Sequence, residues 1–104
     1  MTRKKRDANH NEIADLFRQL GASVSDVTQG ESVGYDLVIG VQGHSATIEI
    51  KADSKRNLTE IEKEHSRTWN GKHAVVHDAA GVLLVFTKLA SGKRFPLECP
   101  RNGW

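Results

Sequence analysis

Two segments of alternating side chains, joined by a glycine turn, constrain the fold of this chain more than any other feature. Apolar residues alternate with other residues over positions 35–41 and again over positions 45–52, which is the period of a half-buried β-strand. The intervening Gln42-Gly43-His44 contains the glycine that a tight turn favours. The two segments are therefore predicted to form an antiparallel hairpin.

The register of this hairpin can be counted from its turn. With the two residues after Val41 as the loop, the facing pairs are Val41 with His44, Leu37 with Ile48, and Asp36 with Glu49. A slip of one residue would put the two apolar sets on opposite faces of the sheet, which burial forbids. The polar face then carries Asp36, Glu49 and Lys51, and the two facing carboxylates would repel each other unless a cation lay between them. We therefore expect a metal ion at this place.

Periodic segments on either side of the hairpin complete the domain. The expected elements are a helix from Asn9 to Leu20 ended by Gly21, a strand within residues 22–28, a helix over residues 59–69 and a strand at residues 74–76. Periodicity does not decide between helix and strand for the apolar residues 82–86, but Asp78 as N-cap and Gly92 beyond the end favour a helix. The order αβββαβ(α) predicts an α/β fold, with a central mixed sheet of about four strands flanked by helices.

Length and charge bound the domain organisation. A chain of 104 residues is long enough for one core and too short for two. We expect one folded domain over residues 9–98, a basic tail at residues 1–8 and an irregular tail at residues 99–104. The formal net charge is only +2, so clusters of cationic side chains are more informative about binding partners than the total charge. They either bind nucleic-acid phosphates or stay solvated, and composition does not decide between the two. The gathered residues are Arg3, Lys4, Lys5, Arg6, Lys55 and Arg56.

Cysteine and apolar content indicate the compartment. The single Cys99 cannot form an internal disulfide, and no apolar stretch approaches the roughly 20 residues that cross a bilayer. The basic start is not followed by the apolar core of a secretory signal. We expect a cytoplasmic protein without a membrane partner.

The residue types on the polar face suit phosphodiester hydrolysis. This reaction needs an activated water and cations that neutralise the charge developing on the phosphate. Mg²⁺ (or Mn²⁺) prefers oxygen ligands, which the carboxylates of Asp36 and Glu49 and the carbonyl of Ile50 provide. Lys51 lies two residues beyond Glu49 on the same face, where its ammonium can contact the phosphate or hold the attacking water.

With these residues the sequence resembles the PD-(D/E)xK nuclease superfamily. The matching positions are Gly34-Tyr35-Asp36 and then Glu49-Ile50-Lys51, with Tyr35 in place of the proline of that pattern. The resemblance implies a restriction-endonuclease-like fold with Asp36, Glu49 and Lys51 as catalytic residues. Family members also begin with a helix that bears an acid, and Glu12 holds that place. The resemblance makes Glu12 an accessory metal ligand.

Residues 58–71 narrow the resemblance to the VRR-NUC nucleases, in which L-T-x-x-Q precedes W-x-G. Here Leu58, Thr59, Trp69 and Gly71 match, and Glu62 stands where that family has glutamine. Stand-alone members are similar in size, occur in phages, and are associated with branched DNA and Holliday junctions. The resemblance thus implies a structure-selective DNA endonuclease of a bacterial or phage-infected cell. Because a four-way junction has two-fold symmetry, we expect a homodimer.

Several residues have a second interpretation. Glu62 fits an accessory catalytic role and equally a capping box with Thr59. Trp69 fits the core better than a platform for base stacking, because it ends a stripe predicted to face inward. His73 and His77 have the spacing of some zinc ligands but lack partners other than Cys99. The inward stripe is predicted to contain Leu58, Ile61, Glu62, His65 and Trp69.

Two other function classes remain at this point. A non-catalytic nucleic-acid-binding module would keep the nuclease fold and grip the backbone with its cationic residues, although such a module has no need of two acids facing DNA. A small interaction protein is a weaker third reading. For a dimer surface, the apolar run 82–86 and Trp104 are the candidates, and each also fits a structural role.

Overall fold

The computed structural model describes residues 9–28, 33–52 and 58–92 of the chain. Its elements follow the predicted order and make an α/β fold with a four-stranded mixed sheet and three helices. The run 82–86, which periodicity did not assign, lies within the last helix. The elements are α1 (His10–Leu20), β1 (Ser23–Asp26), β2 (Leu37–Val41), β3 (His44–Ile50), α2 (Glu60–Thr68), β4 (Lys72–Val76) and α3 (Ala79–Ala90).

The sheet is ordered as the chain runs, β1-β2-β3-β4, with the first two pairings antiparallel and the last one parallel. The predicted hairpin register is confirmed, since Leu37 lies opposite Ile48. Gln42 and Gly43 have φ of 51° and 85°, the positive values that both central residues of a type I′ hairpin turn require. The parallel pairing needs a crossover, and α2 lies within it.

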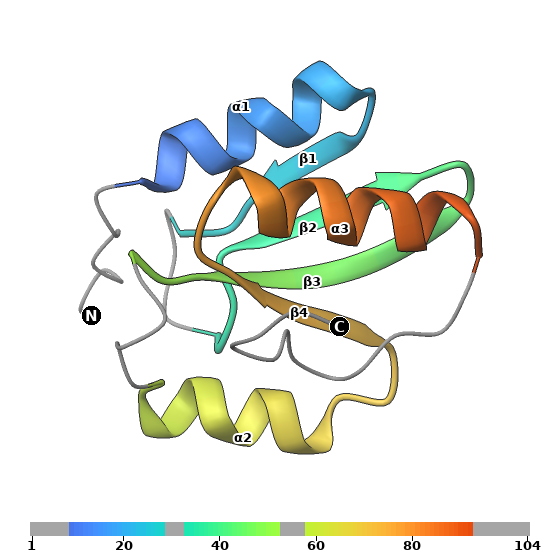
Figure 1. Cartoon of the computed structure of the whole chain (residues 1–104). Coiled ribbons are helices and arrows are strands. Elements are labelled where there is room, and N and C mark those ends of the chain that lie inside the picture. Colours follow the sequence, from blue (N-terminus) through green and yellow to red (C-terminus); the bar gives the residue numbers. More distant parts are fainter. Residues whose placement is uncertain (1–8, 29–32, 53–57, 93–104) are drawn as a thin grey trace.

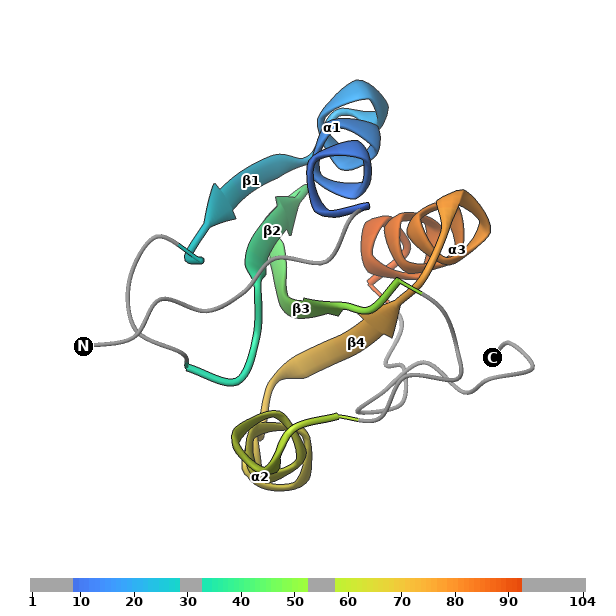
Figure 2. The ribbon, with the colours of Figure 1, turned by 90° about the vertical axis from the view of Figure 1, so that its left-hand side faces the viewer.

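Helices cover both faces of the sheet (Figure 1). Helices α1 and α3 lie side by side on one face, and α2 lies on the other, as the turned view in Figure 2 shows. The apolar face of the hairpin packs under α1 and α3. Among the described residues, no helix is both long enough and apolar enough to cross a bilayer. The core includes Ile13, Phe17, Leu37, Ile39, Ile48, Ile50, Val82, Val85 and Leu89.

The helix ends are set by the predicted residues. Gly21 adopts the left-handed conformation with φ of 105°, and its N–H donates to the carbonyls of Arg18 and Phe17. At the start of α3, the Asp78 carboxylate accepts from the N–H of Gly81 at 3.0 Å. Both caps confirm the expected boundaries to within one residue.

Helix α2 corrects the prediction about which residues face inward. Its buried residues are Glu62 and Ser66, whereas Ile61 is exposed and Trp69 is 42% exposed. The core interpretation of Trp69 is therefore wrong. The physical reason is that α2 covers the polar face of β3, so its polar stripe, not its apolar one, finds partners in the sheet.

Candidate active site

The side chains of β3 that point away from the core form a polar layer beneath α2. Glu49 and Lys51 alternate with the core residues Ile48 and Ile50, as the strand period requires. Glu49 is 1% exposed and Lys51 is 8% exposed. Burying charged groups is costly, so this layer must supply close partners.

Lys51 has two such partners. Its ammonium lies 2.8 Å from the Glu62 carboxylate of α2 and 3.7 Å from the carboxylate of Glu49. The first contact ties the end of β3 to the start of α2, and the second joins two neighbouring positions of one strand face. The Lys51 ammonium is therefore held in a fixed place by charges on two elements.

Glu62 forms the capping box that was one of its two interpretations, and it also contacts Lys51. Its carboxylate accepts from the backbone N–H of Thr59 at 2.8 Å, and its own N–H donates to the Thr59 hydroxyl at 3.2 Å, which completes a capping box. The same oxygen, Oε1, is the one that contacts Lys51. The cap thus fixes the carboxylate that holds the lysine.

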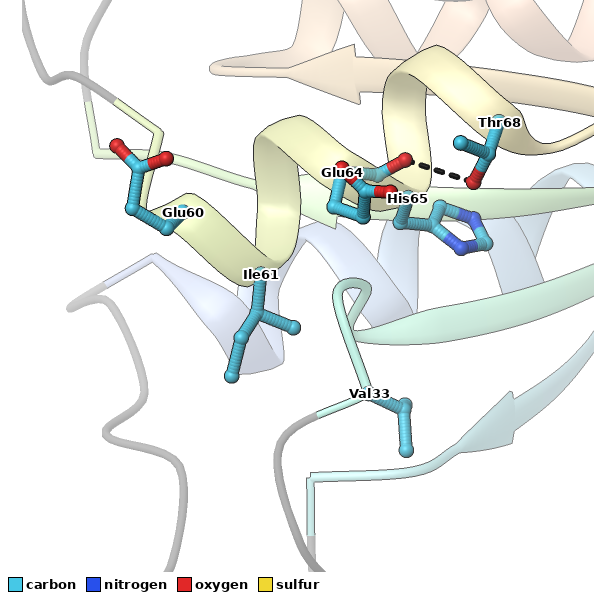
Figure 3. A pocket seen from close by; sticks show the side chains of 6 residues that line it. All are labelled: Val33, Glu60, Ile61, Glu64, His65 and Thr68. Atoms are coloured by element: carbon cyan, nitrogen blue, oxygen red, sulfur yellow. Dashed lines mark hydrogen bonds between the residues drawn. The ribbon is translucent and has the colours of Figure 1, made fainter.

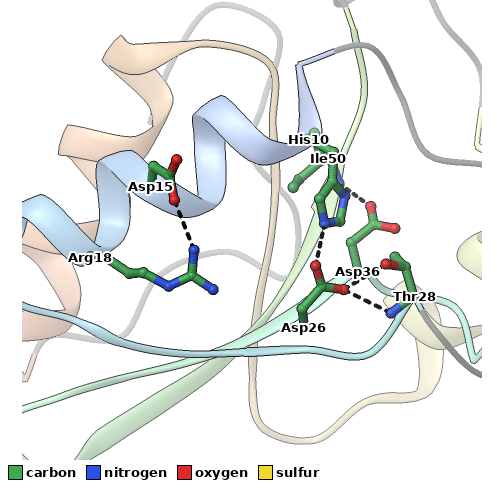
Figure 4. Close-up of polar contacts among 7 residues, drawn as sticks. All are labelled: His10, Asp15, Arg18, Asp26, Thr28, Asp36 and Ile50. Carbon is green, nitrogen blue, oxygen red and sulfur yellow. Dashed lines mark hydrogen bonds and ion pairs between the residues drawn. The ribbon is translucent and has the colours of Figure 1, made fainter.

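Asp36 lies at the same end of the sheet, but not directly opposite Glu49 as predicted. The pairing of β2 with β3 begins at Leu37. The Asp36 N–H donates to the carbonyl of Ile48, the residue before Glu49, at 2.7 Å. The Asp36 carboxylate instead accepts from the N–H of Ile50 at 2.7 Å (Figure 4). It therefore stays beside the segment that carries Glu49 and Lys51.

Gly34 brings the chain close to α2 just before Asp36. A Cβ at Gly34 would lie 2.6 Å from the Cβ of His65 and 2.9 Å from the carbonyl oxygen of Ile61, so only glycine allows this approach to α2. Its φ of 92° is also a conformation that other residues rarely adopt. The chain thus passes close to α2 just before Asp36, whose carbonyl accepts from the N–H of Val27, directly after β1, at 3.0 Å.

Oxygen donors at this strand end fit a hard divalent cation. A carboxylate has about four acceptor sites, so accepting a hydrogen bond, as Asp36 does from Ile50, is compatible with binding a metal ion. Within the ranges that the structure describes, no group of three or more His, Cys, Asp or Glu side chains could hold a metal. A cation here would take Asp36, Glu49, the Ile50 carbonyl and water, and Mg²⁺ characteristically combines one or two carboxylates with several waters.

Glu12, the expected accessory ligand, lies in the first turn of α1 and is exposed. The start of this helix reaches the site end of the sheet, because the Asn9 side chain donates to the carbonyls of His77 at 2.8 Å and Lys51 at 3.4 Å. Among the described residues, Glu12 forms no hydrogen bond or ion pair with Asp36 or Glu49. It is near the site but not part of its contacts.

The pair of His10 and Asp26 also holds this end of the molecule together, and no pattern along the chain indicated it (Figure 4). His10 is buried, and its Nε2–H donates to Asp26 at 2.9 Å, while Thr28 donates to the other Asp26 oxygen from its N–H at 3.0 Å and its hydroxyl at 2.5 Å. Burial raises the pKa of the Asp26 carboxyl, but the bonds from Thr28 and His10 outweigh burial and lower this pKa to about 2. An ionised Asp26 thus anchors the first turn of α1.

Zinc chemistry at the histidines finds no support in the described residues. His73 is buried, and its Nδ1 bonds to the Thr47 hydroxyl at 2.7 Å. His77 lies past the end of β4 with its carbonyl bonded to Asn9. The proposed partner Cys99 is outside the described residues.

A column of rings lies farther along α2. The centroids of Tyr35 and His65 are 4.7 Å apart, and those of His65 and Trp69 are 5.0 Å apart with planes 28° from parallel. The Nε2 of His65 also bonds to the Thr47 hydroxyl at 2.9 Å. Sequence reasoning missed this column, because Tyr35 lies far along the chain from His65 and Trp69.

Beside this column, a hollow of about 490 Å³ lies between α2 and the segment before β2 (Figure 3). It contains none of Asp36, Glu49 and Lys51, and its carboxylates would repel a phosphate. The hollow is therefore separate from the candidate active site. Its lining consists of Val33, Glu60, Ile61, Glu64, His65 and Thr68.

Two buried carboxylates, a backbone carbonyl and a fixed ammonium at one strand end are groups that can hold a divalent cation and a phosphate. Comparisons of the chain with protein-family models, curated proteins and solved structures give no match. The predicted phosphate-binding residues lie outside the described ranges, and these are Arg3, Lys4, Lys5, Arg6, Lys55 and Arg56.

Proposed function

We propose that this chain is a Mg²⁺- or Mn²⁺-dependent endonuclease with a restriction-endonuclease-like fold, which hydrolyses phosphodiester bonds in DNA. The observation that carries the proposal is the buried Lys51, held by Glu62 and Glu49 at the strand end where Asp36 lies. A buried ion pair is often no more stabilising than apolar residues of the same size. Its presence here is therefore better explained by chemistry than by stability.

Each residue has a distinct task in this proposal. Asp36, Glu49 and the Ile50 carbonyl would bind the cation, with Glu12 reaching it through water. The cation supplies charge that polarises the phosphate and lowers the pKa of a bound water. The Lys51 ammonium donates to a phosphate oxygen or to the attacking water, and Glu62 keeps it oriented. Because these groups are fixed before substrate binds, little reorganisation is needed during the reaction.

The substrate proposed is branched DNA, which follows from the resemblance of residues 58–71 to the VRR-NUC nucleases. The cationic residues of the N-terminal segment and Lys55 and Arg56 would contact the phosphate backbone and make binding dependent on salt. A binding module without catalysis remains the alternative outcome of the test below.

The test compares cleavage of a supercoiled plasmid and a synthetic four-way junction with Mg²⁺, with Mn²⁺ and with chelator. We expect metal-dependent cutting, and a loss of about 100-fold or more in Asp36→Asn and Lys51→Gln, since each removes charge from the reacting centre. Lys63→Ala is the matched control, because Lys63 is an exposed lysine of α2 that lies outside the site. Thermal unfolding checks that every variant is folded. Binding of DNA by the folded wild-type protein without metal-dependent cutting would rule out the enzyme.

A further inference from the structure

We infer that Trp69 is a stacking platform for an unstacked nucleobase at the branch point of the DNA substrate. The inference rests on the proposed function, because it takes DNA to be the ligand, and it adds a residue that would select branched over continuous duplex. Trp69 was predicted to lie in the core, but it is 42% exposed.

Trp69 is the exposed end of an ordered column. Its indole stacks on His65 at 5.0 Å, and His65 in turn contacts Tyr35 at 4.7 Å and the buried His73 at 4.8 Å. No other ring among the described residues continues the column beyond Trp69. A nucleobase has the flat face that would add the next member, at a ring separation typical of stacked aromatic pairs.

The indole is also held in place before any ligand binds. A Cβ at Gly71 would lie 2.7 Å from the indole nitrogen, so the backbone runs directly along the ring edge. The ring beneath it is fixed too, since Thr47 bonds to His65. Because the platform is already ordered, stacking a base on it costs little additional side-chain entropy.

The charges near Trp69 favour nucleic acid on this part of α2. The carboxylates that line the hollow, Glu60 and Glu64, belong to the first half of the helix, whereas Arg67 and Lys72 flank Trp69 in the chain. Arg67 pairs with Glu64, and Lys72 begins β4. Because the Arg67 charge is balanced by Glu64, Lys72 is the cation that would meet a phosphate next to a stacked base.

A base stacked on Trp69 would be close enough to Lys51 for one DNA strand to contact both residues. Glu62, which contacts Lys51, precedes Trp69 by seven helical positions, or about 10 Å along the axis. Nucleotides of a duplex strand rise about 3.4 Å each, so the base would lie about three nucleotides from the scissile phosphate. In continuous duplex both faces of every base are covered by neighbours, whereas a branch point exposes one.

The experiment measures binding without hydrolysis, in chelator, to a junction with 2-aminopurine at the branch point and to a continuous duplex of the same length. We expect the wild-type protein to quench 2-aminopurine fluorescence by stacking. Trp69→Ala should bind the junction roughly tenfold more weakly and lose the quenching, with duplex binding unchanged. Trp69→Phe should restore much of both signals, and Leu20→Ala, a change at a residue 38% exposed on α1, should alter neither.

The outcomes separate this inference from the proposed function. Equal junction affinity and equal quenching in wild type and Trp69→Ala would overturn the inference, as would an equal loss on junction and duplex. If the wild-type protein shows the stacking signal but cuts nothing, the inference stands and the enzyme does not. If the wild-type protein cuts DNA and Trp69→Ala binds as the wild type does, the proposed enzyme is supported and the stacking role of Trp69 is not.

Discussion

At the scale of single residues, ionised groups tie this molecule together at one end of the sheet. Lys51 is held by carboxylates from β3 and α2, and the Asp26 carboxylate holds His10 at the start of α1. The hydrogen bonds of the second arrangement depend on the ionisation of Asp26. The Asp26 carboxyl accepts all of its hydrogen bonds only when it is ionised. Protonation of Asp26 in acid should therefore weaken the contact that holds the first turn of α1.

Asp26 should make the free energy of unfolding depend on acid pH. Its pKa is lowered from 3.8 to about 2 in the folded protein. The folded state therefore gains stability from ionised Asp26 above pH about 4, and loses it as the pH falls through about 2, a contribution on the order of 1–2 kcal/mol. Urea unfolding at pH 5, 4, 3 and 2 should show a shallower decline for Asp26→Asn than for the wild type. Asp15→Asn, at an exposed acid of α1, is the control, and a decline equal to the wild type in Asp26→Asn would contradict this account.

At the scale of elements, the sequence predicted what depends on local pattern and missed what depends on packing between elements. The hairpin register followed from a period of two and a two-residue turn, and α1 followed from its apolar stripe and Gly21. The orientation of α2 followed only in part. Glu62 lies inward as predicted and reaches Lys51, but Ile61 and Trp69 of the predicted stripe are exposed. The close approach of Gly34 to α2, just before Asp36, is likewise a contact between elements that no pattern along the chain reveals.

Substitutions at Glu62 should separate the capping role of α2 from its role at Lys51. Glutamine can replace glutamate in a capping box, so Glu62→Gln should keep the helix start while removing the charge beside the ammonium. We expect Glu62→Gln to lower the cleavage rate about tenfold or more, and to lower the melting temperature less than Glu62→Ala does, because the glutamine oxygen still accepts hydrogen bonds. Glu62→Ala should lower the melting temperature as well, by a cap loss of about 1 kcal/mol plus the unpaired buried lysine. Rate and melting temperature that fall together in both variants would show that Glu62 acts only through stability.

At the scale of the whole molecule, the two faces of the sheet have separate tasks. The face under α1 and α3 holds the apolar core, and the face under α2 holds the buried charges, with the ring column beside them. If the protein is the proposed nuclease, any surface that joins two copies must leave Lys51 and Trp69 accessible to DNA. The outer side of α3 meets this condition, because it lies on the opposite side of the sheet from α2 (Figure 2).

The protein should therefore be a symmetric dimer joined away from α2. Matched cuts across a two-fold symmetric junction require two sites related by that symmetry, and each chain supplies one. Of the run 82–86, Val82 and Val85 belong to the core, while Leu83 is exposed on α3 and available for an interface. Sedimentation at micromolar concentration should give twice the 11.5 kDa of one chain, and Leu83→Glu should shift the protein towards the monomer without changing Trp69-dependent quenching. A wild-type mass of one chain would contradict the dimer and leave the two cuts of a junction to independent binding events.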